Sequence, residues 1–209
     1  MAINRLLTDK DREELKPLID DMFSKLPEMM KRKINLANVQ QAFVLDIVRK
    51  WITYECKILS VGCFEDTAYE YLMNTPNKDK VEIVGIDPQI NFDLHSYKGA
   101  SGLFDIVFST SVLEHVEDDE EFVADICSLL KVGGAGILTM DFNDDYRVGD
   151  KLPYSDLRFY TKHDLEFRLA KILTDNGCDL VDAPDWSGTA EFTHDGCNYS
   201  FATFVFRKR

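Results

Sequence analysis

Long apolar runs are missing from this sequence of 209 residues. No stretch approaches the roughly 20 consecutive apolar residues that a membrane-spanning helix needs. The first residues, MAINRLLTDKDREELK, place acidic side chains early and lack the apolar centre of a secretory leader. These absences predict a cytoplasmic protein that has no membrane partner.

Basic side chains are also scarce relative to acidic ones. The 24 lysines and arginines face 37 aspartates and glutamates, which gives a formal net charge of -13 at pH 7. A chain of this charge repels the phosphate backbone of nucleic acids, so we expect no nucleic-acid partner. Lys31, Arg32 and Lys33 form a tight basic cluster, which we interpret as an exposed helix end.

Paired cysteine motifs are absent as well. The cysteines are Cys56, Cys63, Cys127, Cys178 and Cys197, and none belongs to a CxxC pair. No histidine stands at the spacing of a zinc site. Scattered cysteines are typical of a reducing cytosol, where they serve as small buried apolar side chains. The sequence therefore predicts no metal site.

The first quarter of the chain has a helical pattern. Apolar residues recur at helical spacing from residue 9 to about residue 52, with interruptions at Pro27 and at residues 35–38. Thr8 or Asp9 is suited to cap the start of the first helix. We expect a helical cap over residues 1–52 that covers a ligand cleft in a core formed by residues 53–209.

Short apolar runs alternate with helical segments in that core. The predicted strands are 57–61, 81–86, 104–109 and 136–140, with 90–94 as a reduced strand and 178–183 and 200–207 as a closing hairpin. The predicted helices are 67–73, 118–130 and 165–176, the second of them stopped by Gly133 and Gly134. This alternation predicts an α/β fold with a doubly wound, mostly parallel sheet and a closing antiparallel strand.

Two turns at the ends of predicted strands have the composition of a nucleotide site. Gly62 follows the first strand, where the backbone of a doubly wound fold approaches its ligand. Asp87 ends the second strand 25 residues later, at a position from which an acid can accept both hydroxyls of a ribose. The alternative is that Asp87 is an ordinary turn acid. A nicotinamide dehydrogenase is disfavoured because the turn lacks GxGxxG.

Three separated pieces then resemble class I S-adenosylmethionine-dependent methyltransferases in order and spacing. They are FDIVFS at 104–109 with VLEHV at 112–116, LLKVGG at 129–134, and GILT at 136–139. The resemblance covers residues 57–142 and implies a Rossmann-like fold that binds S-adenosylmethionine. No NPPY-like motif of nucleic-acid methyltransferases is present.

The resemblance also implies a set of cofactor-binding residues: Val61, Gly62, Cys63, Glu65, Asp66, Asp87, Pro88, Asp93, Leu94, Ser109, Thr110 and His115. The first turn departs from the family pattern, since Ser60 replaces an acid and Phe64 and Asp66 replace glycines. This departure leaves open an alternative function, a non-catalytic Rossmann-like binding protein with a degenerate cofactor turn.

Candidate catalytic residues are His115, Asp141 and His194, because a hydroxyl acceptor needs a general base. The loop from Asp141 to Tyr160 carries acids and aromatic rings that suit a polar ring, so we expect it to bind the acceptor. Residues 154–161 resemble methyltransferases associated with bacterial surface-polysaccharide gene clusters. We therefore predict O-methylation of a small polar acceptor such as a sugar, with N-methylation and a homodimer left open.

Overall fold

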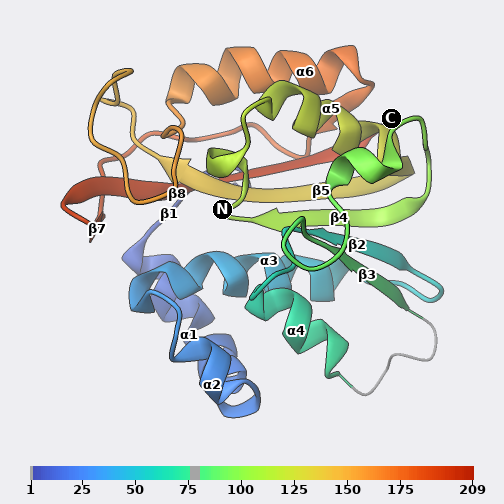
Figure 1. The fold of residues 1–209 in the computed structure, drawn as a ribbon, viewed down its shortest axis with the longest axis horizontal. Helices are drawn as coiled ribbons and strands as arrows, with labels where there is room; N and C mark the ends of the chain where they lie inside the picture. The colour runs from blue at the N-terminus through green and yellow to red at the C-terminus, as the bar shows by residue number, and fades with distance from the viewer. Residues whose placement is uncertain (1, 76–80) are drawn as a thin grey trace.

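A central sheet brings distant segments of the chain together (Figure 1). The structure is a computed structural model that describes residues 2–75 and 81–209. Within those residues the sheet has eight strands in the order β1-β8-β5-β4-β2-β3, with β6 and β7 paired to β8. The strands are β1 (Leu6–Leu7), β2 (Lys57–Val61), β3 (Glu82–Ile86), β4 (Phe104–Thr110), β5 (Leu130–Phe142), β6 (Cys178–Leu180), β7 (Phe192–His194) and β8 (Cys197–Lys208).

The middle of the sheet is parallel and buried on both sides. Strands β2, β3, β4 and β5 pair in parallel, whereas β8 runs antiparallel to β5. Successive residues of a strand point to opposite faces, so Ile58 and Leu59 belong to two different apolar clusters. Strands covered on both faces become continuous apolar runs in the sequence. The predicted doubly wound, mostly parallel sheet with a closing antiparallel strand is confirmed.

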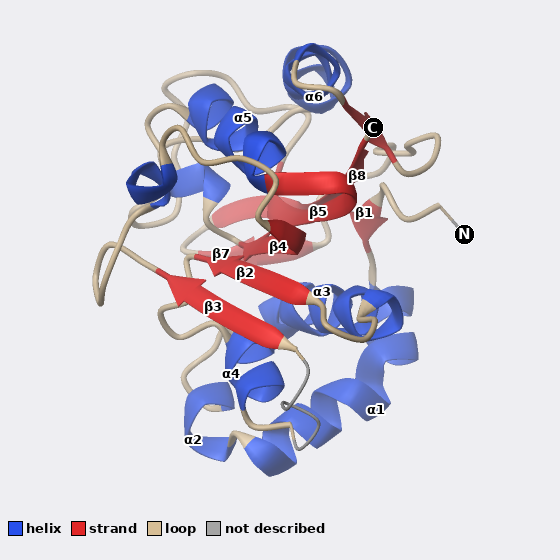
Figure 2. Ribbon diagram, turned by 90° about the vertical axis from the view of Figure 1, so that its right-hand side faces the viewer, coloured by secondary structure: helices blue, strands red, loops and turns tan. Residues whose placement is uncertain are grey.

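Helices cover both faces of this sheet, α1 to α4 on one side and α5 and α6 on the other (Figure 2). The helices are α1 (Asp9–Lys25), α2 (Pro27–Met30), α3 (Asn38–Trp51), α4 (Thr67–Met73), α5 (Asp119–Leu129) and α6 (Ala170–Asp175). A π-helix over Asp164–Leu169 leads into α6 without a break. In the described part of the chain, none of the helices combines the length and apolar character needed to cross a membrane.

The N-terminal helices begin where the sequence predicts them. The backbone nitrogen of Thr8 donates to Oδ2 of Asp11 at 2.9 Å, which stabilises the first turn of α1. Pro27 is the first residue of α2, where a proline needs no backbone hydrogen. The sequence did not predict β1, whose Leu6 pairs with Ala202 of β8. This short pairing attaches the N-terminal segment to the sheet.

The start of β5 differs from the prediction. Gly133 and Gly134 were expected to separate a helix from a strand, but β5 already begins at Leu130, directly after α5. The register between β4 and β5 shifts between Phe104 and Ile106. A Cβ on Gly134 would lie 2.9 Å from the carbonyl oxygen of Lys131. The glycines therefore permit an irregular strand start and do not end the helix.

The segment after β3 was also predicted wrongly. Residues 90–94 form a turn that leads into a 3-10 helix at Leu94–Tyr97, and β3 is the edge of the sheet. The Asn91 side chain explains this, because its Oδ1 accepts from the backbone of Asp87 and its Nδ2 donates to Gly85, both at 2.9 Å. These bonds fold the chain back on β3 instead of extending it.

Candidate functional site

The turn after β2 approaches two other segments closely. Gly62 has a φ of 78°, a left-handed value that glycine adopts without strain. Its backbone nitrogen donates to the carbonyl of Ile86 at 2.8 Å, which ties the turn to the end of β3. A Cβ at position 62 would lie 2.3 Å from Cγ2 of Val112. Glycine is therefore required here, and its bare backbone forms part of a cavity wall.

Two larger residues stand where the family pattern has glycines. Asp66 is buried, and its Oδ1 accepts from the backbone nitrogen of Tyr69 at 2.7 Å, so it caps the N-terminus of α4. Burial raises the pKa of this carboxyl group. Phe64 stays 45% exposed and lines the same cavity as Asp66. A cavity is therefore present beside the turn, although Phe64 and Asp66 stand in place of glycines.

Asp87 lies across this cavity at the end of β3. It is buried, and its Oδ1 accepts from the backbone nitrogen of Gln89 at 2.8 Å. Asn91 accepts from the Asp87 backbone nitrogen at the same time. These bonds hold the carboxylate in place and leave its Oδ2 for the hydroxyl groups of a ligand.

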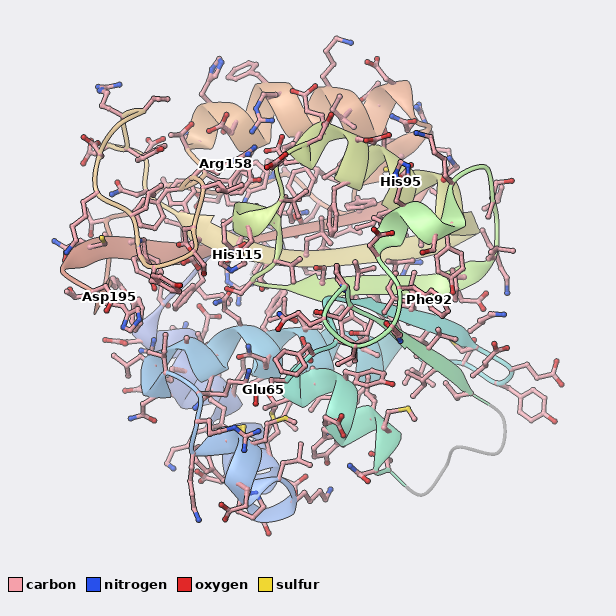
Figure 3. All side chains as sticks on the ribbon, viewed as in Figure 1. Glu65, Phe92, His95, His115, Arg158 and Asp195 are labelled. Atoms are coloured by element: carbon pink, nitrogen blue, oxygen red, sulfur yellow. The ribbon has the colours of Figure 1, made fainter. Side chains whose placement is uncertain are left out.

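Two adjoining cavities open beside these turns, with volumes of about 550 and 500 Å³. Their shared wall residues are Gly62, Asp87, Pro88, Val112 and Val116. The first cavity extends to His115 and the second to Phe92, which Figure 3 labels on the loops that follow β4 and β3. Ligand sites are commonly clefts of this size with a few polar groups. The joined cavities suit an elongated nucleotide-like molecule.

A buried pair of carboxyl groups lies behind the first cavity. Ser111 lines that cavity, and its Oγ donates to Oε1 of Glu114 at 2.8 Å and lies 3.5 Å from Oδ1 of Asp141. Ser111 has a φ of 54°, an unusual value for a residue with a side chain. Burial raises the pKa of both Glu114 and Asp141, and Glu114 raises that of Asp141 further. The pair therefore gives up its protons less readily than two exposed carboxyl groups.

His115 connects the first cavity to a third carboxyl group. Its Nδ1 lies 3.2 Å from the carbonyl oxygen of Ser155 and 3.3 Å from Oδ1 of Asp156. The carbonyl oxygen only accepts, so we assign the ring proton to Nδ1, and Nε2 is left as the acceptor. Burial raises the pKa of Asp156 to about 7, and the neighbouring Glu114 acts in the same direction. The residues Ser155 and Asp156 therefore hold the Nδ1 side of the His115 ring, which lines the cavity.

The loop predicted to bind the acceptor is fixed to the end of β4. Arg158 donates to the carbonyl oxygens of Val116 and Glu117, at 2.9 Å each. The buried Tyr160 hydroxyl donates to Oδ2 of Asp119 at 2.8 Å. These anchors bring Ser155 into the cavity wall and Asp156 against His115.

The predicted cofactor residues gather around these cavities. All except Cys63 and Ser109 line one of the two. Cys63 and Ser109 are buried behind the wall. The binding roles of the whole set stay predictions.

The predicted catalytic residues are less closely grouped. His115 lines the first cavity, and Asp141 lies behind it. His194 lines neither cavity and lies at the tip of the β7–β8 hairpin, with its Nε2 3.7 Å from Oδ2 of Asp195. Its predicted role as a base thus depends on a ligand that reaches this hairpin.

The second cavity has one group of candidate metal ligands at its rim. Within the described residues, the donor atoms of His95, Glu121 and Asp125 lie within 4.8 Å of one another. Glu121 already forms an ion pair with Lys98 at 3.2 Å. The loop acids Asp144 and Asp145 form no such group in the part of the chain that the structure describes.

Three residues of the cavity wall were not predicted from the sequence: Lys33, Gln41 and Ser111. Lys33, Gln41 and Ser111 line the first cavity, and Asp156 contacts His115. Lys33 and Gln41 come from the N-terminal helices, which no motif links to the sheet. Ser111 follows the predicted cofactor residue Thr110, so proximity in sequence was the available indication. Asp156 belongs to the loop predicted to bind the acceptor, but its contact with His115 was not predicted.

Together these features define an α/β protein with a cavity suited to a nucleotide-like cofactor and a histidine, His115, in the wall of that cavity. Residues 7–183 match the family described as a methyltransferase domain. The chain belongs to this family of methyltransferases. No curated protein matched the sequence.

Solved structures share the fold at low sequence identity. The [4+2]-cyclase SpnF is 15% identical with a TM-score of 0.57, over 81% of this chain and 82% of that one. The 1,6-didemethyltoxoflavin-N1-methyltransferase of Burkholderia thailandensis, solved with S-adenosylhomocysteine, is 15% identical with a TM-score of 0.56, over 97% and 91%. A TehB-like methyltransferase from Corynebacterium glutamicum is 18% identical with a TM-score of 0.52, over 79% and 86%.

S-adenosylmethionine is the cofactor of this methyltransferase domain, and the cavity fits it. The bare backbone at Gly62, where a Cβ would collide with Val112, allows close approach of a ligand. Asp87 offers a buried carboxylate oxygen for ribose hydroxyls, and Leu94 gives the second cavity an apolar wall suited to adenine. The alternative of a non-catalytic binding protein is not favoured by the family match.

Proposed function

We propose that this protein transfers the methyl group of S-adenosylmethionine to a hydroxyl oxygen of a small polar acceptor such as a sugar. The observation that carries this proposal is the arrangement of His115, whose Nδ1 faces Ser155 and Asp156 while the ring lines the cavity. A hydroxyl group loses a proton on methylation, and a base within hydrogen-bond reach assists that step.

Each residue of the site has a separate task in this proposal. When bound, S-adenosylmethionine supplies a methyl group on a positively charged sulfur. His115 takes the proton of the acceptor hydroxyl at Nε2, and Asp156 stabilises the imidazolium that forms. Asp141 and Glu114, linked through Ser111, orient a second polar group of the acceptor. The cavity walls position the acceptor beside the methyl group.

The loop from Asp141 to Tyr160 supports a sugar as the acceptor. Ser155 lines the cavity beside His115, and Tyr154 is 91% exposed on the same loop. Hydroxyl groups of a sugar suit such polar side chains, and an aromatic ring suits its apolar face. The resemblance of residues 154–161 to methyltransferases from polysaccharide gene clusters agrees with an acceptor that is a sugar or is linked to a glycan.

A transfer assay with labelled cofactor tests the proposal. The protein is incubated with methyl-tritiated S-adenosylmethionine and a panel of monosaccharides, nucleotide sugars and matched amino sugars, and mass spectrometry locates the added methyl group. We expect the label on a hydroxyl oxygen. His115→Gln should lower the rate at least 100-fold, within the range for loss of a general base.

His163→Gln is the matched control, because His163 packs against Phe167 and lines neither cavity. It should leave the rate unchanged. A methyl group found on nitrogen would refute O-methylation, and an unchanged rate in His115→Gln would remove His115 from the chemistry.

A further inference from the structure

Two residues of the N-terminal helices reach the first cavity. Lys33 follows α2, and Gln41 lies in the first turn of α3. Both line the cavity together with Gly62 and Asp66, which belong to the turn after β2. The helical cap is therefore part of the wall at the end of the cavity that lies nearest this turn.

Lys33 brings a positively charged side chain to this wall. Among the described residues that line the two cavities, no other lysine or arginine occurs. The acidic lining residues are Glu65, Asp66, Asp87, Asp93, Glu117, Asp118, Glu121 and Asp125. A ligand that carries an anionic group thus has a single side chain with a full positive charge available to it.

The acids nearest to Lys33 are already engaged. Glu65 forms an ion pair with Arg32, with Nη2 and Oε1 2.8 Å apart, and Asp66 caps α4. In the part of the chain that the structure describes, the half-buried Lys33 ammonium has no hydrogen bond or ion pair of its own. Burial lowers the pKa of Lys33, because the amine is partly removed from water. An anion bound in the cavity would offset this cost by pairing with the ammonium group.

The second cap residue, Gln41, has an amide oxygen that lacks a hydrogen-bond donor among the described residues. Its side chain is 8% exposed, and its Oε1 is buried without a hydrogen-bond donor among the described residues. A buried carbonyl oxygen without a donor is costly. A donor group on a ligand in this cavity would satisfy it.

We propose that Lys33 and Gln41 bind the amino-acid end of S-adenosylmethionine, Lys33 through the carboxylate and Gln41 Oε1 through the ammonium group. The proposal rests on S-adenosylmethionine as the cofactor. It assigns to the helical cap a direct part in binding, since Lys33 brings a positive charge to the cavity wall and Gln41 brings an amide oxygen without a donor among the described residues, which match the two charges of a free amino acid.

Isothermal titration with two ligands isolates this contact. S-adenosylhomocysteine carries the amino-acid end, whereas 5′-methylthioadenosine has the same nucleoside without it. Lys33→Met should weaken S-adenosylhomocysteine about 10- to 100-fold, the effect of losing a hydrogen bond to a charged group, and leave methylthioadenosine within twofold. Gln41→Leu should show the same selectivity, and Gln41→Glu should retain the binding of S-adenosylhomocysteine.

Lys31→Met is the matched control. Lys31 is exposed, forms an ion pair with Glu28 at 2.8 Å and lines neither cavity, so both ligands should bind as they do to the wild type. Equal weakening of both ligands in Lys33→Met would mean that Lys33 only stabilises the cap, and no weakening would mean that it does not meet the carboxylate. Either result overturns the proposal. A wild-type protein that binds neither ligand would refute the cofactor site itself.

Discussion

At the scale of single residues, one prediction concerns the carboxylate of Asp87 in the cavity wall. We expect Asp87→Ala to weaken S-adenosylmethionine binding by about 1.5–3 kcal/mol, the range for hydrogen bonds to a charged group. Asp87→Asn keeps an oxygen for the backbone nitrogen of Gln89, so it separates the loss of charge from damage to the turn. Titration calorimetry measures both variants. An unchanged dissociation constant in Asp87→Ala would show that Asp87 does not hold the ribose.

A second residue-scale prediction concerns Asp141, which lies with Glu114 behind the cavity, both within reach of Ser111 Oγ. Asp141→Asn keeps the size of the side chain but removes the acid that lies beside Ser111. We expect it to lower turnover with the acceptor found in the transfer assay, while cofactor affinity stays nearly intact. A rate within about twofold of the wild type, only ~0.4 kcal/mol in barrier, would exclude Asp141 from the chemistry.

At the scale of elements, the parallel strands were predictable because burial on both faces leaves a continuous apolar run. The predicted strand 57–61 is β2 residue for residue, and β4 extends one residue beyond its predicted end. The errors occur where side-chain bonds determine the path, as with Asn91 after β3. Apolar periodicity carries no information about such bonds.

The residues of the site also separate into those that local motifs predict and those that only the tertiary packing brings to the cavity. Gly62 and Asp87 could be located because strand ends of a parallel sheet meet at one edge and the motifs there are local. Lys33 and Gln41 could not, because they reach the cavity only through the packing of α3 against the sheet. The contact of Asp156 with His115 depends on a loop anchored by Arg158, and the motifs that contain Arg158 and Val116 do not reveal that these two residues bond to each other.

The cap itself gives an element-scale prediction. Its Arg32 forms an ion pair with Glu65, and Lys33 and Gln41 face the cavity, so a bound ligand should connect the cap to the core. Protection from hydrogen exchange in residues 15–45 should therefore rise when S-adenosylhomocysteine binds. Helix α6, on the other face of the sheet, serves as the internal reference and should not change (Figure 2). An unchanged cap would indicate a purely structural or oligomer-contact role.

At the scale of the whole molecule, the buried acids set how stability responds to pH. Burial raises the pKa of Glu114, Asp141 and Asp156, the last to about 7. Between pH 4 and 7 the unfolded chain has lost the Asp156 proton, whereas the folded protein still holds it. The native state thus binds more protons in this window, and the free energy of unfolding falls as pH rises. Ion-paired acids with a lowered pKa, such as Asp119, act in the opposite direction but below about pH 4.

Asp156→Asn removes one of these titrations. We expect the free energy of unfolding of the wild type to decrease from pH 5 to pH 7 with a slope from Asp156 of up to about 1.4 kcal/mol per pH unit. The variant should lose that part of the slope and gain stability relative to the wild type at pH 8. Urea unfolding followed by circular dichroism at a series of pH values measures this, with Asp145→Asn, an exposed change in the same loop, as the control. If Asp156→Asn and the wild type have parallel pH profiles, the Asp156 carboxyl group is ionised throughout this range, and its place beside His115 is that of an ordinary carboxylate.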